Sequence, residues 1–86
     1  MKMELRYTTR FRIQYRKANK DIQDAFSQIV ELFLEDPDNP FLRNHPLKEK
    51  FAGYRSINVT QDWRAIFKET RSGNAENNHF LLNRNP

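Results

Sequence analysis

The chain has 86 residues, a formal net charge of +4 and no cysteine. A domain of this size buries only about 60 to 65% of the surface that its unfolded chain exposes, so we expect a single domain with one thin core. The lack of cysteine excludes a disulfide framework, a thiolate metal site and catalysis by a cysteine nucleophile. No stretch approaches the roughly 20 apolar residues that cross a bilayer, and residues 1–6 lack the apolar core of a signal peptide. We therefore expect a cytoplasmic protein.

Positive and negative charges are segregated along the chain. Residues 1–20 contain seven Lys or Arg against one acidic residue, whereas residues 21–40 contain six acidic residues and no base. This separation predicts a basic surface that attracts phosphates, with an acidic element facing elsewhere. A solvated charged face without a partner explains the charge pattern equally well.

The first half of the chain predicts one strand followed by two helices. Residues 3–7 alternate between apolar and polar, which is typical of a half-buried strand. Thr8 offers an N-cap ahead of a short basic helix. Residues 21–35 then form an amphipathic helix, whose apolar face comprises Ile22, Ala25, Phe26, Ile29, Val30 and Phe33. The prolines that follow end this helix and begin a loop that runs to residue 46.

The second half predicts three strands. Residues 54–59 and 63–68 have strand character and are separated by a turn at residues 60–62, so we expect an antiparallel hairpin. Residues 70–78 are polar and predict a loop, and residues 79–82 predict a last short strand. The order β-α-α-β-β-β indicates an α+β domain, with two N-terminal helices packed on one face of a twisted, mainly antiparallel sheet of about three or four strands. The other face is then available for a ligand.

A motif between residues 45 and 67 is the most informative part of the sequence. It runs as His45-Pro46-Leu47-Lys48, then Gly53-Tyr54-Arg55, then Asp62-Trp63 before an apolar strand. This motif resembles the signature of the YafQ-like toxins, which are ribosome-dependent mRNA endonucleases of the RelE/ParE superfamily. The resemblance implies a RelE-like toxin domain over residues 1–86 and a cognate small antitoxin as partner. It also implies binding to mRNA in the ribosomal A site and to ribosomal RNA.

The motif residues fit the chemistry of RNA cleavage without a metal. This reaction needs proton transfer at the attacking 2′-hydroxyl and at the leaving oxygen, together with stabilisation of negative charge at phosphorus. His45 and Asp62 can transfer protons, and Arg64 can hold the phosphate, so these three are the catalytic candidates. The candidates for RNA or phosphate binding are Lys48, Lys50, Arg55 and Trp63. Because the chain has only two histidines and no acidic pair at ligand spacing, we expect neither a metal site nor a cofactor.

Several of these residues also have a structural explanation. His45 precedes a proline in a loop, and Asp62 can serve as the turn residue of the hairpin. Trp63 shares strand parity with Phe67, so core packing explains it better than substrate binding does. Arg64 has the opposite parity and is expected on the open face of the sheet. The basic side chains of the first helix more often form a solvated face, although a diffuse basic surface suits docking on ribosomal RNA.

The sequence departs from the YafQ-like pattern at two places. The family has a histidine where this chain has Asn58, and an amide cannot exchange a proton near neutral pH. The family also closes with a segment of the Arg or Gly-Thr-His type and a final aromatic residue, whereas here residues 83–86 contain only Arg84 as a possible phosphate ligand. His79 opens the last strand, and we expect a structural role for it. These departures predict a weakened endonuclease.

Three functions therefore compete. The first is a ribosome-dependent mRNA endonuclease that an antitoxin neutralises. The second is a degenerate toxin that mainly binds antitoxin, which the two departures favour. The third is a ParE-like inhibitor of DNA gyrase, against which His45 and Asp62 argue.

Overall fold

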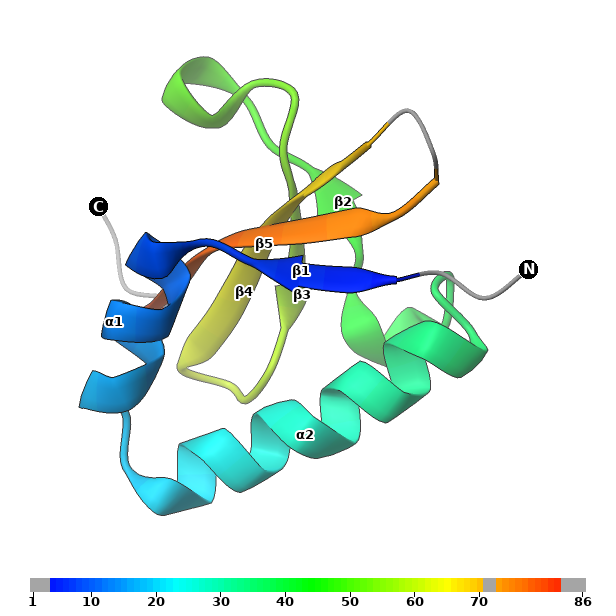
Figure 1. Ribbon diagram of the computed structural model, residues 1–86. Helices are drawn as coiled ribbons and strands as arrows, with labels where there is room; N and C mark the ends of the chain where they lie inside the picture. The colour runs from blue at the N-terminus through cyan, green and yellow to red at the C-terminus, as the bar shows by residue number, and fades with distance from the viewer. Residues whose placement is uncertain (1–3, 71–72, 83–86) are drawn as a thin grey trace.

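Two helices pack against one face of a mixed β-sheet (Figure 1). The computed structural model describes residues 4–70 and 73–82. Its strands and α-helices are β1 (Leu5–Tyr7), α1 (Thr9–Lys17), α2 (Lys20–Glu35), β2 (His45–Pro46), β3 (Arg55–Asn58), β4 (Trp63–Glu69) and β5 (Ala75–Leu82), and its 3-10 helices are η1 (Pro40–Leu42) and η2 (Glu49–Phe51). This arrangement confirms the predicted α+β fold with both helices near the N-terminus.

The strands follow the order β1-β5-β4-β3-β2 across the sheet. β1 pairs with β5 in parallel, and the other neighbouring strands are antiparallel. Among the described residues the sheet has five strands, one more than the order β-α-α-β-β-β predicts. The additional strand is β2, because His45 and Pro46 pair with β3 instead of remaining in the loop.

Side-chain caps set the start of both helices. The Thr8 hydroxyl accepts a hydrogen bond from the Phe11 amide at 3.1 Å, and the Asn19 side-chain oxygen accepts one from the Ile22 amide at 3.0 Å. Each cap satisfies an amide that the first helical turn leaves without a partner. In the described part of the chain, no helix is long and apolar enough to cross a membrane.

The core lies between the two helices and the sheet. The rings of Phe11, Phe26 and Phe80 approach one another to 5.3–5.4 Å between centroids, and so join both helices to β5. Farther along α2, Phe33 meets Phe67 of β4 at 5.1 Å. The predicted buried face of α2 is confirmed at Phe26, Ile29 and Phe33, whereas Val30 is only half-buried.

The last strand begins earlier than the sequence pattern indicates. Residues 75–78 belong to β5, although their polar composition predicts a loop. Neighbouring strands override this local preference: β1 pairs with β5 on one side from Leu5 opposite Ala75, and β4 pairs with it on the other. Asn77 is buried there, and its side-chain amide donates to the Arg6 carbonyl at 3.4 Å.

Strand alternation separates two faces of the β3–β4 hairpin. The side chains that join the core beneath the helices are Ile57, Ala65 and Phe67. Their neighbours along the strands point to the opposite face, and these are Ser56, Asn58, Arg64 and Ile66.

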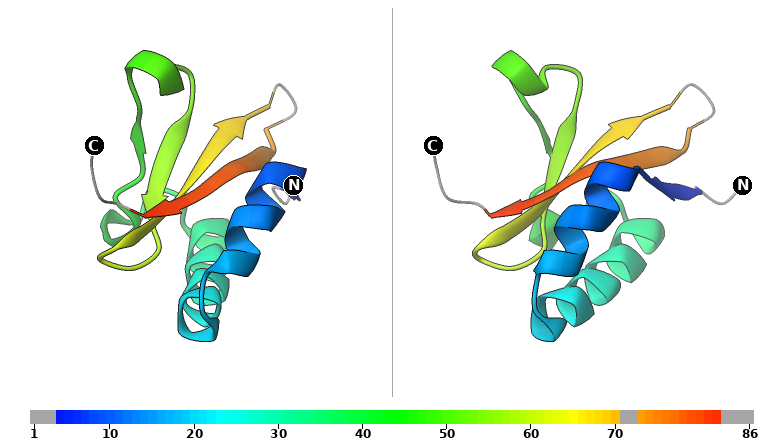
Figure 2. Two further views of the ribbon diagram at one scale, coloured as in Figure 1. Left: turned by 90° about the vertical axis from the view of Figure 1, so that its left-hand side faces the viewer. Right: turned by 60° about the vertical axis from the view of Figure 1, so that its left-hand side comes forward.

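A loop over residues 47–54, which contains η2, covers part of that opposite face. Figure 2 shows η2 on the side of the sheet away from α2. The Phe51 ring lies 5.1 Å from the His79 ring, and Ser56 and Ile66 are fully buried at 0% exposure. The expectation of an open face is therefore wrong for this part of the sheet.

Candidate functional site

His45 is positioned by its pairing with β3. It stands directly opposite Ser56, so its side chain lies on the face away from the helices. Its Nδ1 lies 2.6 Å from the Arg43 carbonyl oxygen. Because a carbonyl only accepts, Nδ1 carries the proton in this contact, and in the neutral ring Nε2 is left as an acceptor. His45 is exposed, so this nitrogen has the chemistry of a general base.

Arg64 lies on the same face, near the end of β4 that adjoins the turn. It is half-buried and stands opposite Asn58 in the last pair of the β3–β4 hairpin. Among the described residues, its buried Nε has no hydrogen-bond partner. A buried donor without a partner is unusual, and an anionic ligand would satisfy it.

The register places His45 and Arg64 near each other without bringing them into contact. Cross-strand pairing forms one row of His45, Ser56, Ile66 and His79, and the next row contains Asn58 and Arg64. β3 separates the strands of His45 and Arg64, and the two residues are also two positions apart along the strands, so their backbones are about 12 Å apart. An attacking 2′-oxygen lies within about 3–3.5 Å of the phosphorus, so the side chains of His45 and Arg64 have to extend toward each other to act on one nucleotide.

Asp62 lies at the edge of this face, in the exposed turn that joins β3 to β4. It is not the side-chain acceptor that holds the turn. Thr60 has that role, because its hydroxyl accepts from the amides of Asp62 at 3.2 Å and Trp63 at 3.1 Å. The Asp62 carboxylate therefore belongs to the turn next to the pair of Asn58 and Arg64.

Two of the candidates for RNA binding lie on the other side of the sheet. Trp63 stacks on Phe80 at 5.1 Å and packs against the core. The Arg55 Nε donates to the Asn44 side-chain oxygen at 2.7 Å, in a pocket that Phe33 also lines. Neither residue is brought to the face of His45 and Arg64, because both have the parity of the helix-facing row.

The two lysine candidates belong to the covering loop. Lys48 immediately precedes η2, and Lys50 lies within it; both are exposed. The Lys50 ammonium is 5.4 Å from the centroid of the Phe51 ring. Exposed lysines at the rim of this face can attract RNA phosphates.

His79 is a member of this face that the sequence reasoning did not use. It stands opposite Ile66, and its ring contacts those of Phe51 and Tyr54. Burial lowers the pKa of His79, and the positive charges of Arg10 and Lys50 lower it further. The sequence predicts that the last strand starts at His79, which does not indicate the face of the sheet that His79 occupies. The pairing of His79 with Ile66 of β4 shows that face.

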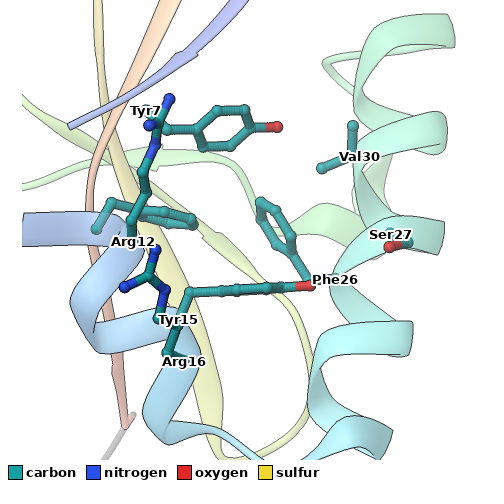
Figure 3. A pocket seen from close by; sticks show the side chains of 8 residues that line it. Tyr7, Arg12, Tyr15, Arg16, Phe26, Ser27 and Val30 are labelled. Atoms are coloured by element: carbon teal, nitrogen blue, oxygen red, sulfur yellow. The ribbon is translucent and has the colours of Figure 1, made fainter. Parts of the chain in front are cut away.

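A groove lies on the helix side of the molecule (Figure 3). It has a volume of about 410 Å³ between α1 and α2. Its apolar lining comprises Tyr7, Phe11, Tyr15, Phe26 and Val30, and its basic side chains are Arg12 and Arg16. Burial raises the pKa of Tyr7, and the neighbouring Tyr15 raises it further. This lining suits apolar side chains accompanied by carboxylates.

No clustered metal ligands occur in the part of the chain that the structure describes: no group of three or more His, Cys, Asp or Glu side chains has the spacing to hold an ion. The segment after Leu82, where the YafQ-like pattern has its closing catalytic groups, lies outside the described residues.

Comparison with solved structures identifies the fold. Over 94% of this chain and 93% of the other, it resembles YafQ from E. coli strain BL21(DE3), with a TM-score of 0.77 and 21% identity. A YoeB/ParE toxin from Agrobacterium tumefaciens matches 95% of this chain over 100% of its own, with a TM-score of 0.76 and 20% identity. The toxin-antitoxin complex RelBE2 from Mycobacterium tuberculosis matches 95% of this chain over 99% of its own, with a TM-score of 0.68 and 19% identity.

No family model and no curated protein matches the sequence. The structural matches nevertheless extend over almost the whole chain. The protein therefore has the RelE-like α+β fold of these toxins.

Proposed function

We propose that this protein is the toxin of a type II toxin-antitoxin system and that it cleaves mRNA on the ribosome. One observation carries the proposal: in a chain with the fold of YafQ, a histidine with an available Nε2 and an arginine with an unpartnered Nε share one sheet face. The likeness of the motif around these residues to YafQ-like toxins supports it independently.

The proposed reaction uses side chains of this face. His45 takes the proton of the 2′-hydroxyl, whose oxygen then attacks phosphorus. Arg64 neutralises the negative charge that accumulates on the phosphoryl oxygens. The bond from phosphorus to the 5′-oxygen breaks, and that oxygen takes up a proton that Asp62 relays from solvent. Lys48 and Lys50 hold phosphates at the rim.

A small acidic antitoxin is the proposed partner. One of the structural relatives is a toxin-antitoxin complex, which supports this assignment. The groove between α1 and α2 offers such a protein an apolar surface with a basic rim (Figure 3).

The second candidate function is a weakened toxin that binds antitoxin without efficient cleavage. The position of Asn58 favours it, because the residue stands directly opposite Arg64 on the proposed catalytic face. An amide at this position can hydrogen-bond to a phosphate but cannot exchange a proton with it.

Controlled expression in a bacterial host tests both candidates. We expect the unmodified chain to arrest growth and to produce new mRNA 5′ ends within ribosome-protected codons. His45→Ala and Arg64→Ala should abolish these ends, whereas Glu31→Gln, at an exposed acidic residue of α2, should leave them unchanged. Growth arrest with intact mRNA and impaired DNA supercoiling would instead indicate a gyrase inhibitor. Normal growth together with binding to the adjacently encoded small protein would indicate the weakened toxin.

A further inference from the structure

Three rings form a cluster on the sheet face away from the helices. Phe51 comes from η2, Tyr54 from the residues after it, and His79 from β5. The Phe51 ring lies 5.1 Å from that of His79 and 6.2 Å from that of Tyr54, and Tyr54 and His79 are 6.5 Å apart. All three pairs meet edge to face, and all three residues are half-buried. Because they pack edge to face, the three rings do not stack on one another.

Basic side chains surround these rings. The Lys50 ammonium lies 5.4 Å from the Phe51 centroid, and the Lys68 ammonium lies 5.8 Å from the Tyr54 centroid. Arg10 of α1 is near enough for its charge to act on His79. Glu76 stands opposite Lys68 and offsets part of this positive charge. Glu49 of η2 is a second carboxylate nearby, and the four bases Lys48, Lys50, Lys68 and Arg10 outnumber these two acids.

A purely structural role explains only part of this arrangement. The loop over residues 47–54 lies above Ile66, which is fully buried, and any apolar cover would achieve that. A cover made of aromatic rings with lysines over them has the composition that proteins use to bind single-stranded RNA, where bases stack on rings and cations hold the phosphates.

The cluster also lies beside the proposed catalytic face. His79 pairs opposite Ile66, and Arg64 is two residues before Ile66 on the same strand and the same face. Diagonal neighbours of this kind in a sheet are about 7–8 Å apart, which places His79 next to Arg64, with Phe51 and Tyr54 on the side of His79 away from Arg64.

We propose that the cluster of Phe51, Tyr54 and His79 is a base-stacking subsite for single-stranded RNA, and that it holds the nucleotide next to the one whose phosphate meets Arg64. The position of this subsite relative to the cleaved phosphate rests on the proposed function. Binding of RNA by the rings can be measured without cleavage.

Binding of fluorescently labelled oligoadenosine, roughly 10 nucleotides long to span the cluster, tests the proposal with purified protein. We expect Phe51→Leu and Tyr54→Leu each to weaken binding by about 5- to 100-fold, because both remove a stacking surface while retaining apolar cover. Phe51→Tyr and Tyr54→Phe keep the ring and should stay within about twofold of the unmodified chain. The control is Lys17→Gln, which removes a charge at the end of α1 but no ring, and it should weaken binding less than either leucine variant.

Inorganic polyphosphate of similar charge separates stacking from attraction of phosphates. The leucine variants should bind polyphosphate as the unmodified chain does, and their melting temperatures show whether they fold. If oligoadenosine binds no better than polyphosphate, or if folded leucine variants keep full affinity for oligoadenosine, the proposal is overturned and the rings serve only to cover Ile66. The proposal is also overturned if Phe51→Tyr and Tyr54→Phe lose as much affinity for oligoadenosine as the leucine variants do.

Failure of the proposed function has a different outcome. An unmodified chain that leaves ribosome-bound mRNA intact, yet binds oligoadenosine in a ring-dependent manner, would refute the endonuclease and support the subsite.

Discussion

Replacement of Phe26 by alanine should destabilise the protein more than a substitution at any exposed position of α2. Phe26 is 5% exposed, and its ring meets those of Tyr7, Phe11, Tyr15 and Phe80 at centroid distances between 5.3 and 6.4 Å. Truncation of a buried phenylalanine costs about 3–5 kcal/mol. The side chain also lines the groove between α1 and α2, so water can enter the space that it leaves, and we expect a loss near 3 kcal/mol.

This loss is large for so small a domain. At about 0.05–0.15 kcal/mol per residue, a chain of this length has a free energy of unfolding of roughly 4–13 kcal/mol. A loss near 3 kcal/mol would lower the melting temperature by about 12–24 °C. Urea unfolding followed by the fluorescence of Trp63 is a suitable assay, because Trp63 stacks on Phe80 within the same ring cluster.

Leu34→Ala is the matched control on the same helix. Leu34 is 46% exposed, so its truncation should cost less than about 1 kcal/mol. A loss below about 1 kcal/mol for Phe26→Ala, or equal losses for the two variants, would refute the assignment of this ring cluster as the centre of the core.

Three further predictions concern the site and its support. Asn58→His should raise cleavage of ribosome-bound mRNA, since a positioned acid or base contributes about 10²- to 10⁴-fold; unchanged 5′-end counts would mean that no proton is exchanged opposite Arg64. His79→Phe should reduce the loss of stability between about pH 7 and pH 5, because the lowered pKa of His79 means that the unfolded chain binds the proton first as the pH falls below about 6.5. If the urea midpoints of His79→Phe and of the unmodified chain change equally between pH 7 and pH 5, the partly buried environment assigned to His79 is wrong. Thr8→Ala should cost about 0.5–2 kcal/mol and Thr8→Ser much less, since only alanine removes the acceptor of the Phe11 amide; equal losses in urea unfolding would exclude the capping role.

Local patterns in the sequence were sufficient for the helices and the central hairpin. The apolar spacing of residues 21–35 predicts α2, and Thr8 predicts the start of α1. The alternation of residues 63–68 predicts β4. In each case the residues that determine the structure are near one another in the chain, so helical or strand periodicity is visible in the sequence. Parity also placed Arg64 and Trp63 on opposite faces of the sheet.

The extent of β5 and the composition of the site depend on contacts between distant segments. β5 begins at Ala75 because it pairs with β1, about 70 residues earlier, and the register shift between Ile66 and Phe67 breaks the alternation along the strand. The covering loop over residues 47–54 and the position of His79 beneath Phe51 likewise arise from tertiary contacts. The sequence of a strand shows its own alternation but not which strands it pairs with or in which register. The start of β5 and the surroundings of His79 therefore depend on the assembled sheet.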